Sequence, residues 1–97
     1  MIKVVIERTI AQDMETTYEI EVKRALKAVM GASGFISGES FVDINHPNVR
    51  TIITTWENLS CWNRWFKSDL RRDSNYNLTQ ILAQEEKVKV LMTQPLS

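Results

Sequence analysis

The chain has 97 residues, of which 43% are hydrophobic and 25% charged, and this predicts one ordinary globular domain over residues 1–97. Twelve basic residues balance twelve acidic ones along the chain, which argues against nucleic acid or an anionic membrane as a partner. Cys61 is the only cysteine, so an intramolecular disulfide is excluded. The chain also lacks a segment of membrane-spanning length and a signal-peptide core after Met1, so we expect a cytoplasmic protein.

The hydrophobic pattern predicts the elements in chain order. Residues 2–9 alternate and are rich in β-branched side chains, which predicts a strand, and apolar residues at helical spacing predict a helix over residues 13–30. Strands are expected over residues 35–44 and 50–57, paired antiparallel across the turn at residues 45–48. Asn58 would cap a helix over residues 59–70, and the polar residues 71–77 would break or bend it before one more helical turn over residues 78–82. A last strand is expected over residues 85–93, before Pro95.

This order, β-α-β-β-α-β, is that of a ferredoxin-like α+β fold, with helices on one face of a four-stranded antiparallel sheet. Several strands carry apolar side chains toward both faces. Those expected on one face are Val5, Phe35, Phe41, Ile53 and Leu91, and apolar neighbours such as Ile36 and Val42 lie opposite them. In a sheet with one solvent-exposed face, apolar and polar side chains alternate more strictly along each strand. We therefore expect a second copy to cover the other face, in a homodimer packed sheet to sheet. A monomer with a partly apolar sheet face is the alternative.

All three tryptophans lie within residues 56–65. On a helical wheel Leu59, Phe66 and Leu70 fall within about 20° of one direction, which predicts that they form the core stripe of the helix. Trp62 falls at the edge of this stripe and Trp65 lies roughly 120° from its centre. Trp65 therefore either covers a neighbouring segment or lines a cavity between helix and sheet. A cavity flanked by Trp62, Trp65 and Phe66 would bind a flat aromatic ligand.

The runs Ile52–Asn58 and Trp65–Asp69 resemble the signature of the antibiotic biosynthesis monooxygenase domain. This resemblance implies a dimeric α+β barrel. The family includes cofactor-independent oxygenases that act on polyketides, quinol monooxygenases and haem-degrading monooxygenases. The resemblance therefore implies cofactor-independent oxidation, by dioxygen, of a small aromatic or quinol-like compound. A non-catalytic ligand-binding or regulatory dimer of the same fold is the alternative, and a haem-binding variant is a third possibility.

The haem-degrading branch of the family uses an Asn on the first strand, a Trp on the second helix and a His about ten residues later. Trp65 matches the Trp, but Glu7 stands in place of the Asn and Asn75 in place of the His. The only histidine, His46, lies in the predicted turn beside Pro47. Because the usual axial ligand of haem iron is missing, we expect neither a cofactor nor a metal, and haem is disfavoured.

The resemblance also assigns candidate roles. If Glu7 matches the family Asn, it points into the pocket, where a desolvated carboxylate could act as a general base toward a phenol. The alternative is a surface carboxylate paired with a neighbour. Asn75 is the second candidate catalytic residue, as a polar contact to the substrate. The pair Arg71 and Arg72 could hold an anionic group of a ligand or could simply be solvated at a helix end.

Overall fold

Four antiparallel strands form one sheet in the computed structural model, which describes residues 1–96. The strands are β1 (Ile2–Thr9), β2 (Phe35–Val42), β3 (Val49–Trp56) and β4 (Lys87–Met92), and they lie in the order β2-β3-β1-β4. β1 and β3 are therefore central, and Val4 pairs with Thr54 on one side and Val90 on the other. The predicted strands are confirmed, with bounds that differ by one or two residues at some ends.

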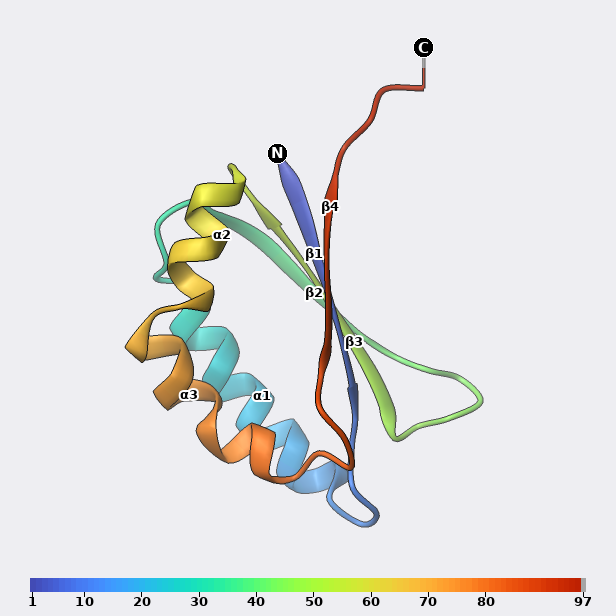
Figure 1. Ribbon diagram of the computed structural model, residues 1–97. Coiled ribbons are helices and arrows are strands. Elements are labelled where there is room, and N and C mark those ends of the chain that lie inside the picture. Colours follow the sequence, from blue (N-terminus) through green and yellow to red (C-terminus); the bar gives the residue numbers. More distant parts are fainter. Residues whose placement is uncertain (97) are drawn as a thin grey trace.

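Three helices cover one face of this sheet (Figure 1). They are α1 (Glu15–Val29), α2 (Leu59–Phe66) and α3 (Asp69–Gln80), and α3 packs against α1. The predicted ferredoxin-like architecture is confirmed, with its second helical segment divided in two. Within residues 1–96, the structure contains no helix that is both long enough and apolar enough to span a membrane. The predicted domain of residues 1–97 ends at Ser97, which lies outside the described residues.

The division between α2 and α3 corrects the predicted helix over residues 59–70. The Ser68 hydroxyl donates to the carbonyl oxygen of Trp65 at 2.7 Å and accepts from the backbone N–H of Arg71 at 3.1 Å. The Ser68 side chain thus provides a donor for a backbone carbonyl at the end of α2 and caps the start of α3. The polar residues 71–77, expected to break the helix, are helical because α3 buries Asn75 and Leu78 on its inner side and leaves mostly polar residues outside.

The core stripe predicted for α2 is also wrong. Leu59, Phe66 and Leu70 are 49%, 43% and 57% exposed, whereas Cys61, Trp62 and Trp65 are buried. A single helical wheel over residues 59–70 ignores the break at Ser68 and so assigns Leu70 to a helix to which it does not belong. Indole also buries more apolar area than a leucine side chain, so the face with the two tryptophans turns toward the sheet.

Two features fix α2 close to the sheet. Asn58 caps the helix by accepting from the backbone N–H of Cys61 at 3.0 Å, as its place in the sequence predicts. Gly34, just before β2, has φ +85°, and a Cβ at this position would lie 2.3 Å from the Cys61 sulfur. Only glycine combines this backbone conformation with so close an approach, so Gly34 lets α2 pack against the start of β2.

β1 divides its side chains between the two faces of the sheet. Ile2, Val4 and Ile6 are buried on the helix side, in one core cluster with Trp56, Trp62 and Trp65. The register places four apolar residues on the helix-free face, namely Val5, Phe41, Ile53 and Leu91. Phe41 and Leu91 are 44% and 48% exposed there, so this face is more apolar than is usual for a sheet face in contact with solvent.

Candidate functional site

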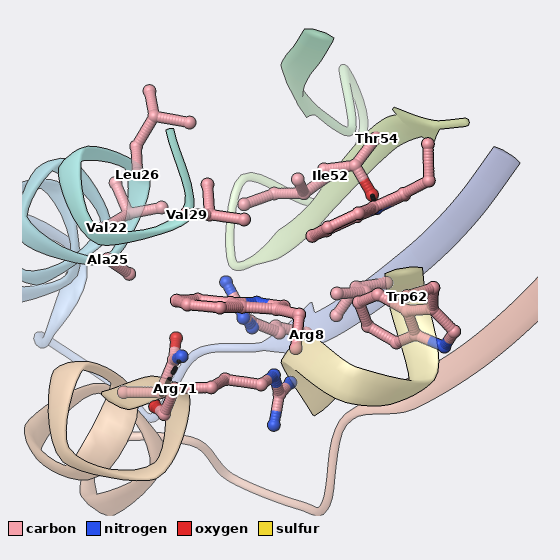
Figure 2. A pocket seen from close by; sticks show the side chains of 13 residues that line it. Arg8, Val22, Ala25, Leu26, Val29, Ile52, Thr54, Trp62 and Arg71 are labelled. Carbon is pink, nitrogen blue, oxygen red and sulfur yellow. Dashed lines mark hydrogen bonds between the residues drawn. The ribbon is translucent and has the colours of Figure 1, made fainter. Parts of the chain in front are cut away.

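A cavity of about 50 Å³ lies between the helices and the helix-covered face of the sheet. Much of its wall is aliphatic, contributed by α1, β1 and β3 through Ile6, Val22, Ala25, Leu26, Val29 and Ile52. Trp56, Trp62 and Trp65 add aromatic surface, and Arg8, Thr54, Arg71 and Asn75 are the polar members. Figure 2 shows Val22, Leu26 and Val29 facing Ile52 and Thr54, with Arg8 and Arg71 on the side of β1 and α3. An apolar cavity with few convergent polar groups is typical of a small-molecule site.

Two of the three tryptophans are held firmly in the wall. Trp56 is fully buried, and its indole N–H donates to the Thr54 hydroxyl at 2.9 Å. Trp62 packs edge to face on Trp56, with ring centroids 5.6 Å apart and planes at 64°. Such pairs stabilise beyond their buried area, so Trp56 and Trp62 form a fixed end of the cavity.

Trp65 lies between the cavity and a groove on the outer surface. It is 7% exposed and lines the cavity on one side, and it also lines the outer groove together with Cys61, Ser68 and Leu70. A rotation of this side chain would connect the cavity with the groove.

Asn75 lies at the α3 side of the cavity and is 7% exposed. Its Nδ2 donates to the carbonyl oxygen of Arg71 at 2.9 Å, one helical turn earlier. This bond fixes the orientation of the carboxamide and leaves its oxygen as an acceptor for a ligand hydroxyl. The structure thus brings Asn75 together with Trp62 and Trp65, three of the five residues that the sequence singled out.

Arg8 is the cavity residue that sequence reasoning missed. It is 3% exposed, and its Nε donates to Glu86 Oε2 at 3.0 Å, while Nη1 lies 3.5 Å from the Tyr18 hydroxyl. Arg71 Nη2 donates to Glu86 Oε1 at 2.8 Å, so one carboxylate joins both arginines. The signal was present in the sequence, because Arg8 continues the alternation of Ile2, Val4 and Ile6 toward the buried face.

Glu86 is ionised through its arginine partners. Burial alone would raise the pKa of its carboxyl, but the hydrogen bond from Arg71 and the charges of Arg8 and Arg71 outweigh burial and lower that pKa below its ordinary value. The cluster of two guanidinium groups and one carboxylate therefore carries one net positive charge. This charge lies beside an otherwise apolar cavity.

Glu7 and Phe66 lie outside the cavity, which corrects the expectation that they line it. Glu7 is on the opposite face of the sheet, where its side chain is 44% exposed and its Oε1 lies 3.9 Å from Lys87 Nζ. It is therefore a surface carboxylate beside a neighbouring lysine, and a base role inside the pocket has no geometric support. Phe66 is half-exposed, and its ring lies under the Arg71 guanidinium at 4.7 Å, so it contacts the site only from outside.

The lining residues do not fit a haem iron. None of the described residues that line the cavity carries an imidazole, thiolate, thioether or phenol, which are the protein groups that ligate haem. His46 lies in the exposed turn between β2 and β3, away from the cavity lining. Among residues 1–96 there is also no group of three or more His, Cys, Asp or Glu that could hold a metal ion.

Known structures share this fold. A conserved protein from Methanosarcina mazei Go1 superposes with a TM-score of 0.87 at 15% identity, over 96% of this chain and 92% of the other. An antibiotic biosynthesis monooxygenase gives a TM-score of 0.87 at 14% identity, over 98% and 100%. A variant of SnoaB, a cofactor-independent oxygenase from Streptomyces nogalater, gives 0.85 at 14% identity, over 98% and 95%.

The comparison of the sequence with curated proteins finds no match. The sequence model of the family Antibiotic biosynthesis monooxygenase, in contrast, matches residues 1–75, which include β1, the Trp65 region and Asn75. The match extends over more than half of the chain, so the protein belongs to the antibiotic biosynthesis monooxygenase family.

Proposed function

We propose that the protein is a cofactor-independent monooxygenase that oxidises a small hydroxylated aromatic compound with dioxygen in the cavity beside Trp65. The observation that carries the proposal is the joint placement of Trp65, Asn75 and the arginine pair around one apolar cavity. The aromatic ring would lie against the indole and the aliphatic wall. The Asn75 carboxamide oxygen would accept from a ring hydroxyl.

The reaction needs no electron donor other than the substrate. A hydroxyarene with an unsubstituted position para to its oxygen loses a proton, and the resulting anion passes one electron to dioxygen. Superoxide and the ring radical then combine to form a C–O bond. The proton on that carbon leaves, the O–O bond breaks, and the products are a quinone and one water. One oxygen atom of dioxygen enters each product, so the balance is that of a monooxygenase.

The protein contributes position and charge to this sequence. Holding a substrate in a reactive geometry lowers the entropic part of the barrier. The net positive charge of Arg8, Arg71 and Glu86 favours the anionic form of a bound hydroxyarene, so its proton can leave to solvent without a carboxylate base. The apolar wall keeps water away from the radical pair.

Movement of Trp65 would enlarge the cavity for a substrate. The cavity volume of about 50 Å³ is smaller than the ~150 Å³ cavity that holds benzene in an engineered protein. Because Trp65 separates the cavity from the outer groove beside Leu70, its rotation would open a path and enlarge the site at once. A Trp65→Phe variant, with a smaller ring, is expected to admit substrates more readily and to orient them less well.

Oxygen uptake tests the proposal. The chelator-treated protein with 1-naphthol is expected to consume one dioxygen per substrate and to form the 1,4-quinone. Arg71→Gln should slow uptake at least tenfold, whereas Arg72→Gln, in which a neighbouring exposed arginine is changed, should leave it near the wild-type rate. Binding of a panel of hydroxyarenes without oxygen uptake would instead favour the non-catalytic ligand-binding protein.

We also propose that the protein is a homodimer packed through the helix-free face of the sheet. Val5, Phe41, Ile53 and Leu91 lie on that face, and no described residue of the chain covers Phe41 or Leu91 fully. Sedimentation at micromolar concentration is expected to give twice the chain mass of 11.2 kDa. A Phe41→Glu variant should lower the mass to that of one chain, and a wild-type monomer would contradict the proposal.

A further inference from the structure

The two cavity arginines hold more hydrogen-bond donors than their protein partners use. Arg8 donates from Nε to Glu86 and only distantly from Nη1 to Tyr18, and Arg71 donates from Nη2 to Glu86. A guanidinium carries five N–H donors. Among the hydrogen bonds of the described residues, Arg8 Nη2 and Arg71 Nε and Nη1 have no acceptor. Both side chains belong to the cavity lining, so a ligand in the cavity lies beside these guanidinium groups.

Burial makes these spare donors significant. Arg8 is 3% exposed, and the Arg71 side chain is 13% exposed. The spare nitrogens still contact solvent, because Glu21 Oε2 is the one fully buried side-chain nitrogen or oxygen atom without a hydrogen-bond partner among the described residues. A ligand that displaces this solvent must accept their hydrogen bonds to bind well, which favours an anionic acceptor. Glu86 already shows that the pair can hold a carboxylate, since each of its oxygens accepts from a different arginine.

We propose that the cavity selects planar aromatic monoanions, with a carboxylate or phenolate oxygen held by Arg8 and Arg71 and the ring against Trp65. This deepens the proposed function, because it states which ligands that cavity takes, but it concerns binding and needs no oxygen chemistry. Glu86 is the positioning residue in this scheme. It orients both guanidinium groups and reduces their two charges to one net charge, which a monoanion neutralises.

Matched ligands that dioxygen does not oxidise test the selectivity. Benzoate and benzamide have nearly the same shape and differ in charge, and calorimetric titration of the full chain measures both. Benzoate is expected to bind at least tenfold more tightly than benzamide. The 15N–1H indole signals of Trp56, Trp62 and Trp65 report the location, because all three tryptophans line the cavity. A second arm uses 4-nitrophenol, whose phenolate absorbance should rise at fixed pH when the protein is added.

Arginine variants distinguish binding in the cavity from non-specific attraction of the anion to surface charge. Arg71→Gln should bring the benzoate-to-benzamide preference close to one, whereas Arg72→Gln, at a position 71% exposed, should keep it. Equal binding of benzoate and benzamide, a preference that survives Arg71→Gln, or no binding of either ligand would overturn the proposal. A tenfold benzoate preference with no oxygen uptake on 1-naphthol would overturn the proposed function alone.

The role of Glu86 has its own readout. Glu86→Gln adds one net positive charge, which strengthens the binding of a dianion more than that of a monoanion. The affinity ratio of phthalate to benzoate should therefore rise at least threefold, and a loss of packing would not raise it, since it weakens both ligands. An unchanged ratio in the folded variant would overturn the role of Glu86. If Glu86→Gln does not fold, Arg71→Gln provides the opposite test, because it removes one positive charge from the cluster. It should lower the affinity ratio of phthalate to benzoate.

Discussion

Glu7 and Arg8 are neighbours in β1 whose side chains lie on opposite faces of the sheet. Arg8 is 3% exposed and lines the cavity, whereas the Glu7 side chain is 44% exposed and lies near Lys87. The one-residue offset places a cation in the cavity where a carboxylate base was expected. In the proposed reaction, positive charge rather than a general base would therefore favour deprotonation of the substrate.

Substitution of the two neighbours should have unequal effects. Glu7→Gln is expected to change the free energy of unfolding by less than about 0.5 kcal/mol, as is usual for an exposed position with a distant partner. Arg8→Gln removes the charged hydrogen bond to Glu86 and should cost about 2 kcal/mol. Urea denaturation of both variants measures the difference. Equal losses for Glu7→Gln and Arg8→Gln would contradict the assignment of faces.

The buried face of α2 predicts a second contrast. Trp62→Ala should destabilise the protein by about 3–5 kcal/mol, because the indole is 4% exposed and packs on Trp56. Leu59→Ala should cost less than about 1 kcal/mol, because this side chain is half-exposed. Thermal unfolding followed by circular dichroism compares the two variants. A larger loss of stability for Leu59→Ala than for Trp62→Ala would contradict this packing and support the core stripe predicted from the sequence.

The turn before β2 predicts a contrast between two glycines. Gly34→Ala places a Cβ 2.3 Å from the Cys61 sulfur at φ +85°, so both the backbone and α2 must shift. The expected loss is more than about 2 kcal/mol. At Gly31 the nearest atom to a Cβ is 3.7 Å away, so Gly31→Ala should be close to neutral. Chemical denaturation of both variants tests this, and a stable Gly34→Ala protein would show that α2 does not pack as described.

The Glu86 cluster predicts acid sensitivity. The pKa of Glu86 is lowered in the folded protein below its ordinary value of 4.5, so the folded state binds the proton less well than the unfolded state. Its contribution to stability is therefore fully present above about pH 4.5 and is lost as the pH falls through the folded-state pKa. The melting temperature of the wild type should fall in this range. In Glu86→Gln that part of the fall should be absent, and an unchanged acid profile would contradict the ion pairing.

Local patterns were sufficient to predict most of the fold but only part of the site. Alternation in β1 and the turn at Pro47 indicated the sheet. Trp65 and Asn75 came from the family resemblance, Asn75 as the position about ten residues after the family Trp, and both line the cavity. Ser68 stands between Lys67 and Asp69, on the side of the predicted helix opposite the apolar stripe, and a serine there does not by itself indicate a break. The predicted cytoplasmic location rests on the sequence alone.

The arginine cluster could not be predicted in full because Glu86 meets Arg8 across 78 positions of sequence. No local period brings residues so distant together, and only the pairing of β4 with β1 does so. The alternation with Ile6 indicates the side of β1 on which Arg8 lies, whereas the resemblance to the haem-degrading branch points to Glu7.

The central claim is that the chain inserts one atom of dioxygen into a hydroxyarene with no cofactor. Mass spectrometry of the product formed from 1-naphthol under ¹⁸O₂ tests it most directly. The expected result is a quinone with one ¹⁸O atom at the new carbonyl, formed by chelator-treated protein and at least tenfold more slowly by Arg71→Gln. A quinone without ¹⁸O accompanied by hydrogen peroxide, or no product beyond the protein-free control, would contradict the claim.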